Sequence, residues 1–263
     1  MKTLIGMIHL DALPGTPRSD LSVSEIARRA SAEARIYREA GFPSVLIENM
    51  HDTPYLARNV GPEIVSAMTI AGQAVRAEFP GKIGLQILAG ANEAAIAVAF
   101  SCEFQFIRAE AFSFGHIADE GWMNACAGPL LRYRKSIGAD AVEVWTDIKK
   151  KHASHAITSD ISLAENATAA EYMGASAVIV TGRVTGDAPD ANDFTDLRSH
   201  TALPVVIGSG VSESNLTQLW PLADAFIVGS SLKTGGHWRG DLDATRVKKL
   251  ADLAARLSAM ELR

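Results

Sequence analysis

Two short turns of small residues late in the chain have the composition of an anion-binding site. One follows the apolar run Val205–Ile207 and the other follows Phe226–Val228. The residues of the two turns are Gly208, Ser209 and Gly210, and Gly229, Ser230 and Ser231. Glycine lets a ligand approach the backbone closely, serine adds a hydroxyl donor, and two such turns at strand ends form a cup of N–H groups that favours a phosphate. The alternative interpretation is a pair of ordinary tight turns, where glycine and serine are common.

Charged and polar side chains occupy alternate positions of several other apolar segments. In segment 141–147, Val142 and Val144 share the apolar face, which places Asp147 on the opposite face. The same reasoning predicts an unusually polar set on the inner face of a barrel: His9, Asp11, Glu48, Gln86, Arg108, Glu110, Glu143 and Asp147. Buried charges are costly unless they are paired, so this set indicates a site rather than a core. An ion pair between Arg108 and Glu143 without a chemical role is the structural alternative.

Asp147 and Glu110 are the first candidates for acid–base chemistry. They end segments that are neighbours in a barrel wound in chain order, and two nearby carboxylates cannot both ionise cheaply, so the pKa of one should rise. Lys149 is expected to be their electrostatic partner, and His9 and Glu48 are further acid–base candidates. The alternative is that Asp147 caps the following loop and Glu110 pairs with Arg108. The expected substrate-binding residues are Arg108, Gln86, Thr181 and His116.

Two loops carry further candidates. Residues 111–125 form a long segment with His116, Asp119 and Glu120, and long loops of this kind often act as lids. The other loop begins with a run of lysines and contains His152 and His155. Two histidines three positions apart need a third ligand to bind zinc, and none can be identified. We therefore predict no specific metal site and no cofactor, and the sequence leaves open whether the protein binds a divalent metal ion.

Eight short apolar segments alternate with helical patterns along the chain, which predicts one (β/α)8 barrel, a TIM barrel, over residues 1–263. Ser22 and Ser162 open two of the helices with S-x-x-E capping boxes. The predicted strands are 4–10, 44–48, 82–88, 106–110, 141–147, 177–181, 205–207 and 226–228. The predicted helices are 22–40, 62–79, 92–101, 126–137, 162–173, 193–200 and 243–257, with a helix-sized segment before the last strand. An open doubly wound sheet is the alternative, but its G-x-G-x-x-G fingerprint is absent after the first strand.

Composition restricts the classes of function. The chain has 263 residues and a net charge of −5, and it lacks long basic runs, so nucleic acid is not an expected partner. No stretch reaches the ~18 apolar residues of a spanning helix, so an integral membrane protein is not expected. Cys102 and Cys126 follow no metal or disulfide pattern and are expected to be reduced thiols of a cytoplasmic protein. A homo-oligomer is left open.

Seven segments, in the same order, resemble the BtpA family. They are GMIHLDALPG (6–15), IENMHDTPY (47–55), FIRAEAFSFGHIADEGWMNACAG (106–128), DIKKKHASHAITSDISL (147–163), VIVTG (178–182), VIGSGV (206–211) and FIVGSSLKTGGHW (226–238). The resemblance implies a (β/α)8 barrel grouped with the ribulose-phosphate-binding barrels. It also implies a link to photosystem I accumulation in cyanobacteria, although other members occur in bacteria without photosynthesis, some beside sugar-uptake genes. It carries over no catalytic residue.

Three hypotheses of function follow. The first is an enzyme, an isomerase, epimerase or lyase, that acts on a small phosphorylated metabolite such as a sugar phosphate by acid–base chemistry. The second is a metal-dependent hydrolase that uses His9, Asp11, Glu48 and a loop histidine. The third is a non-catalytic assembly factor, which a charged interior disfavours. Fold alone does not choose among the three.

Overall fold

The computed structural model describes residues 2–182 and 191–261. Within them, eight parallel strands close into a barrel in chain order, which confirms the predicted fold class. The barrel strands are β1 (Thr3–His9), β2 (Ser44–Glu48), β3 (Lys82–Gln86), β4 (Phe106–Ala109), β7 (Glu143–Ile148), β9 (Ala177–Val180), β10 (Val205–Ile207) and β11 (Ala225–Val228). Two of the predicted strands match these bounds, and the others differ by one or two residues at an end.

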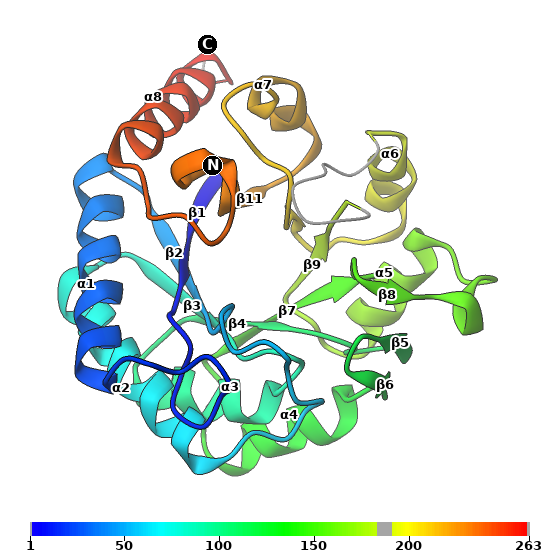
Figure 1. Cartoon of the computed structure of the whole chain (residues 1–263). Coiled ribbons are helices and arrows are strands. Elements are labelled where there is room, and N and C mark those ends of the chain that lie inside the picture. The colour runs from blue at the N-terminus through cyan, green and yellow to red at the C-terminus, as the bar shows by residue number, and fades with distance from the viewer. Residues whose placement is uncertain (1, 183–190, 262–263) are drawn as a thin grey trace.

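Helices surround the barrel on the outside (Figure 1). They are α1 (Val23–Ala40), α2 (Pro62–Glu78), α3 (Asn92–Ser101), α4 (Ala127–Ser136), α5 (Leu163–Tyr172), α6 (Ala191–His200), α7 (Leu216–Leu219) and α8 (Ala244–Glu261). Both predicted capping serines accept a hydrogen bond from the backbone N–H three residues ahead, and Ser162 completes a full capping box. The segment before β11 is shorter than predicted, because Pro221 lacks a backbone N–H and follows α7 in a single 3-10 turn, η2 (Trp220–Leu222).

Side-chain alternation along the strands divides the core into two layers. The outward layer packs against the helices as predicted and includes Val142, Val144, Val45, Ile47, Ile83 and Leu85. Inside the barrel, Phe106 stacks on Trp145 with ring centroids 4.0 Å apart, and small and branched side chains from the other strands fill the remaining space. The middle of the barrel interior is therefore an apolar plug, and the charged side chains that line the cavity lie beyond it, at the carboxyl ends of the strands.

Two residues of the predicted polar interior lie elsewhere. Asp11 follows the end of β1 and accepts a hydrogen bond from Arg29 of α1 at 3.3 Å. Glu143 begins β7, at the opposite end of the barrel from Asp147, and its Oε2 lies 3.3 Å from Nζ of Lys82. Positions 143 and 147 are four residue steps apart along the strand, about 13 Å at ~3.3 Å per step. The suggested ion pair between Arg108 and Glu143 is therefore wrong.

The long loop after β4 is folded into a hairpin. Strands β5 (His116–Ala118) and β6 (Gly121–Met123) pair in antiparallel fashion, and β8 (Ala153–Ser154) from the loop after β7 adds to the other edge of β5. The resulting three-stranded sheet lies outside the barrel on the α5 side (Figure 1). The expected lid thus contains regular structure, and it is joined to the loop that carries the lysine run. In the two described ranges, no helix combines the length and the hydropathy that a membrane crossing requires.

A glycine in β1 sets the distance between the barrel and α1. A Cβ atom at Gly6 would lie 2.2 Å from Cε1 of Tyr37, whose buried hydroxyl donates to the carbonyl of Met7 at 2.9 Å. We expect Gly6→Ala to lower the free energy of unfolding by about 1–3 kcal/mol, since a rigid ring must move in a close-packed core. Urea denaturation measures this. The same substitution in a Tyr37→Leu background should cost clearly less, and equal costs in both backgrounds would contradict the packing explanation.

Candidate active site at the carboxyl end of the barrel

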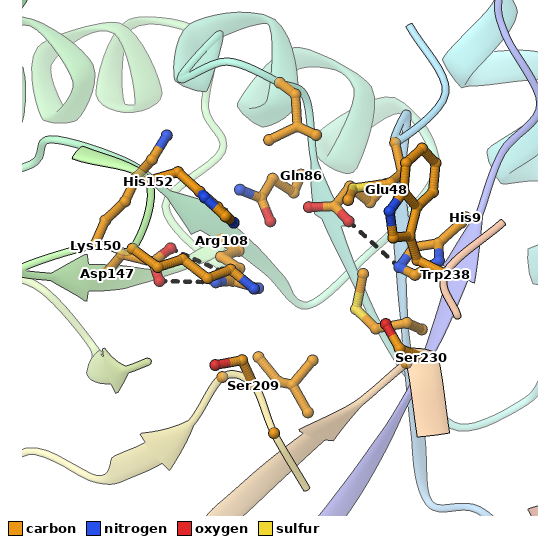
Figure 2. Close-up of a pocket in the computed structure, with 18 of the residues that line it drawn as sticks. His9, Glu48, Gln86, Arg108, Asp147, Lys150, His152, Ser209, Ser230 and Trp238 are labelled. Atoms are coloured by element: carbon orange, nitrogen blue, oxygen red, sulfur yellow. Dashed lines mark hydrogen bonds and ion pairs between the residues drawn. The ribbon is translucent and has the colours of Figure 1, made fainter. Parts of the chain in front are cut away.

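A cavity of about 650 Å³ opens at the carboxyl ends of the barrel strands. Its floor is the top of the apolar plug, where Met7 and Ile227 lie, and its walls come from the loops after most of the strands. Figure 2 shows Ser209 and Ser230 on one side of this space, and Gln86 and Glu48 across from them. Substrates of barrel enzymes bind at this end, because parallel strands direct their following loops to it.

All six residues of the two small-residue turns line the cavity. Gly210 adopts a left-handed backbone with φ of 74°, which glycine tolerates best. Ser231 ends the second turn, and its hydroxyl donates at 2.7 Å to the carbonyl of Val211, the residue after the first turn, so the two turns are tied together. Among the described residues, no backbone carbonyl accepts from the N–H groups of Ser230 and Ser231, which open the short helix η3 (Ser230–Leu232). These donors are available to a ligand.

Gly208 and Gly229 are required for a reason that differs from the one the sequence suggested. A Cβ atom at Gly208 would lie 2.4 Å from Cγ2 of Ile179, and one at Gly229 would lie 3.2 Å from Cε1 of His9. Both glycines therefore make room for side chains of the barrel interior. Close approach of a ligand to their backbone is a second consequence of the same small size.

Arg246 supplies a positive charge at the same end of the cavity. It lies on the first turn of α8, and its Nη1 donates to the carbonyl of Ser231 at 3.2 Å. About half of the side chain is exposed, so the guanidinium keeps donors free for a bound anion. Arg246 could not be identified from the sequence, because a helical pattern does not show which exposed residue of the helix contacts a neighbouring turn.

Asp147 and Glu110 both lie at the cavity, but each is held by its own cation. Arg108 donates two hydrogen bonds of 2.8 Å to the carboxylate of Asp147, in the bidentate geometry that guanidinium groups favour (Figure 2). Glu110 contacts Nζ of Lys150 at 2.6 Å and accepts from Nε2 of Gln86 at 2.8 Å. The suggested pairing of Glu110 with Arg108 is therefore wrong. The adjacent strands bring the two carboxylates to one mouth as expected.

The lysine partner is Lys150 rather than Lys149. Lys149 has a left-handed backbone with φ of 46°, and its side chain lines a small second pocket behind the cavity. His116, expected to bind substrate, lies in that second pocket too, with its ring centroid 5.4 Å from that of His155. Strand β7 continues to Ile148, one residue further than predicted, so the lysine run starts in a different register. Because three lysines follow one another, the sequence alone does not show which of them pairs with a carboxylate of the cavity.

Lys151 is the second lysine at the cavity. Its backbone N–H donates to Oγ1 of Thr181 at 3.1 Å, so Thr181 holds the lysine loop and does not itself line the cavity. Burial, and next the charge of Arg108, lower the pKa of Lys151 to about 8. Within the described parts of the chain, no carboxylate lies within 4 Å of its Nζ atom, in contrast to Lys150.

Glu48 and His9 form a third polar pair. Nε2 of His9 lies 3.5 Å from Oε2 of Glu48, and both side chains are almost completely buried (Figure 2). Burial lowers the pKa of His9 to about 3, helped by the charge of Lys233, so its imidazole is neutral at pH 7. Burial raises the pKa of Glu48, opposed by Arg108 and Lys151. A carboxyl group with a raised pKa keeps its proton more readily than a free one, and this property suits Glu48 to act as a proton carrier.

The remaining wall is partly apolar and partly acidic. Met50, Tyr55 and Trp238 line one side, and Trp238 stands beside His9 in Figure 2. Asp119 and Glu120, at the tip of the β5–β6 hairpin, line the rim. Oε1 of Gln86 is buried without a hydrogen-bond partner among the described residues, so it can accept from a ligand hydroxyl. Trp238 ends one of the segments that carry the family resemblance, but it lies in the irregular loop after β11, where no strand or helix pattern predicts the position of a side chain.

The ligand set proposed for a metal-dependent hydrolase is not assembled. His9, Glu48 and His152 line the cavity, but Asp11 lies on the outside of the barrel beside Arg29. Within residues 2–182 and 191–261, no group of three or more histidine, cysteine, aspartate and glutamate side chains is arranged to hold a metal ion.

Comparisons with known proteins place this barrel in a family. The sequence matches the model of the BtpA family over residues 1–256. The chain belongs to the BtpA family. It is 46% identical over 251 residues to an uncharacterised mitochondrial protein of Caenorhabditis elegans, covering 94% of this chain and 90% of the relative. It is 31% identical over 254 residues to the photosystem I biogenesis protein BtpA of Synechocystis, covering 96% of this chain and 88% of that protein.

Solved structures share the fold of this BtpA-family chain. Phosphoribosyl anthranilate isomerase from Thermus thermophilus superimposes with a TM-score of 0.57 at 15% identity, covering 98% of this chain and all of that one (100%). At such low identity the likeness concerns the fold alone. It agrees with the closed parallel barrel described above.

His9 should make the stability of the protein depend on pH. Its folded pKa of about 3 lies below the usual ~6.5, so the unfolded chain binds the additional proton, and stability falls as pH drops from 6.5 toward 3. Between pH 7 and pH 5 this amounts to at most about 2 kcal/mol. We expect His9→Gln to lose less stability than the parent over this interval, measured by urea denaturation. The surface variant His200→Gln should behave as the parent, and identical slopes for all three would refute the assignment.

Proposed function

We propose that this protein is an enzyme that acts on a small phosphorylated metabolite of the size of a sugar phosphate. The proposed reaction is an isomerisation, an epimerisation or a lyase reaction. One observation carries the proposal: a single cavity has anion donors on one side and buried acid–base groups on the other. Its volume of about 650 Å³ falls in the range of ~300–1,000 Å³ typical of small-molecule sites.

The anion end supplies affinity and orientation. In the proposal, the phosphate accepts hydrogen bonds from the backbone N–H groups of Ser230 and Ser231 and lies within reach of Arg246. Helix η3 is too short to provide a helix dipole. In the proposal, the backbone N–H donors of Ser230 and Ser231 and the guanidinium of Arg246 therefore bind the phosphate. Similar barrels include one named for a phosphoribosyl compound, which agrees with this choice of ligand.

The opposite side supplies proton transfer. Glu48 is the proposed proton carrier, because burial raises its pKa while His9 stays neutral beside it. Asp147 and Glu110 are proposed to stay in their ion pairs and to accept hydrogen bonds from substrate hydroxyls, which orients the sugar. Arg108 and Lys150 then stabilise negative charge that develops on a substrate oxygen, as an enediolate oxygen would.

A non-catalytic assembly factor is the second candidate, since one relative is named as a photosystem I biogenesis protein. A scaffold that presents only its outer surface has no use for ion pairs in its cavity, which cost desolvation energy. The two candidates differ in one measurable respect: only the enzyme requires the cavity to bind a small molecule.

Phosphorylated sugars should stabilise the protein, and the stabilisation should depend on the anion end. We expect at least one member of a panel of pentose and hexose phosphates to raise the melting temperature, while the unphosphorylated sugars do not. Ser230→Asp should abolish the shift, because it places a negative charge in the cup, and Arg246→Gln should reduce affinity about tenfold. Arg256→Gln, an exposed change on the same helix, is the control. Equal shifts in all variants would refute the anion end.

Glu48 should be required for turnover but not for ligand binding. For a sugar phosphate that stabilises the protein, conversion is followed by NMR in the parent and in Glu48→Gln. The variant keeps the size of the side chain and removes the proton carrier, so we expect a loss of about 10²-fold or more in turnover. Glu143→Gln serves as the control, because Glu143 begins β7 at the end of the barrel away from the cavity. Turnover in Glu48→Gln within a small factor of the parent would show that the proton carrier lies elsewhere.

A further inference from the structure

We propose that Lys151 is a nucleophile that forms an imine with the carbonyl carbon of a phosphorylated aldehyde or ketone. The inference rests on the proposed function and narrows it, since only carbonyl-containing phosphates are then substrates. It assigns a role to a cavity side chain that neither the phosphate end nor the proton carrier uses.

The position of Lys151 differs from that of both neighbouring lysines. Lys149 lines the small pocket behind the cavity, and Lys150 is fixed as an ammonium by its contact of 2.6 Å with Glu110. Lys151 lines the main cavity, is anchored through its backbone by Thr181, and has no carboxylate within 4 Å of Nζ in the described residues. Of the two lysines that line the cavity, it is thus the one that can lose a proton without breaking an ion pair with a described residue.

The surroundings favour the neutral amine, which is the nucleophilic form. Burial and the nearby charge of Arg108 lower the pKa of Lys151 to about 8. At pH 7.5 roughly a quarter of its side chains would be neutral, against about 0.1% for a lysine of ordinary pKa. A lysine activated by partial desolvation next to a second cation is an established arrangement for Schiff-base chemistry.

Glu48 lies within electrostatic range of Lys151 and can supply the proton that the step needs. The nitrogen lone pair attacks the carbonyl carbon, and the electrons of the C=O π bond move to oxygen, which takes up a proton. The nitrogen supplies that proton, the Glu48 carboxylic acid then protonates the hydroxyl, and water leaves as the C=N bond forms, which gives a protonated imine beside the Glu48 carboxylate. An amine and a carbonyl compound give an imine and water, so no oxidant or reductant is consumed.

The imine fits the reactions proposed for this cavity. Its protonated nitrogen withdraws electrons from the neighbouring carbon, which weakens an adjacent C–H or C–C bond. Loss of the proton leads to isomerisation, and loss of the carbon fragment leads to a lyase reaction. In either case the phosphate at the turns of Ser209 and Ser230 fixes the carbonyl end of the ligand relative to Lys151.

Borohydride trapping tests the proposal on the full chain. The protein is mixed with glyceraldehyde 3-phosphate or pyridoxal 5′-phosphate, reduced with sodium borohydride, and mapped by peptide mass spectrometry. We expect the reduced adduct on Lys151, formed at least about tenfold faster at pH 7.5 than on the exposed Lys249. Its rate should rise with pH to a midpoint near 8, and excess inorganic phosphate should suppress it.

Two variants keep the test decisive. Lys151→Arg keeps the charge and should lose the fast-forming adduct while its melting temperature stays close to that of the parent. Lys149→Arg, two positions earlier, should keep the adduct. Labelling that favours Lys150, or that is spread evenly over surface lysines, or absent, would overturn the imine proposal.

The trapping result is separable from the proposed function. Stabilisation by sugar phosphates without an adduct at Lys151 would leave a phosphate-binding enzyme that works by proton transfer alone. A fast adduct that inorganic phosphate does not suppress, without stabilisation by any sugar phosphate, would show a reactive lysine and refute the phosphate site.

Discussion

The buried pair of Arg108 and Asp147 determines how the carboxyl end of the barrel is organised. The two charged groups lie on the adjacent strands β4 and β7 and form one bidentate pair. Removal of either partner would leave the other as an unpaired buried charge. Arg108 pairs with Asp147, and Glu110 pairs with Lys150. Lys151 has no ion pair with a described carboxylate, and the more distant charge of Glu48 offsets only part of the effect of burial on its pKa. The chemistry available to the cavity follows from this order of pairing.

The apolar plug beneath the cavity has an equally definite effect. Phe106 and Trp145 fill the barrel interior, so the charged side chains of the cavity lie closer to the carboxyl ends of the strands and the cavity has an apolar floor. Burial shifts the pKa values of His9, Glu48 and Lys151 in the directions that disfavour their charged forms. The same side chains on an open surface would have no such properties.

The fold could be predicted from the sequence because it depends on patterns that are local. Alternation along strands gave the closed barrel and the inward position of Asp147, and the two glycine-rich turns gave the lining of the anion end. The partners of the charged residues could not be predicted in the same way. Whether Lys149 or Lys150 meets Glu110 depends on one residue of strand length, and the reach of Arg246 and Trp238 depends on how distant loops fold back.

The small sheet outside the barrel joins two loops that the sequence presents as separate. Strand β8 lies only two residues beyond Lys151, and it pairs with β5 of the hairpin that brings Asp119 and Glu120 to the rim. A displacement of the hairpin therefore pulls on the lysine loop through backbone hydrogen bonds. The acidic rim and the two cavity lysines are thus mechanically connected, so a movement of the hairpin would also move the amine of Lys151.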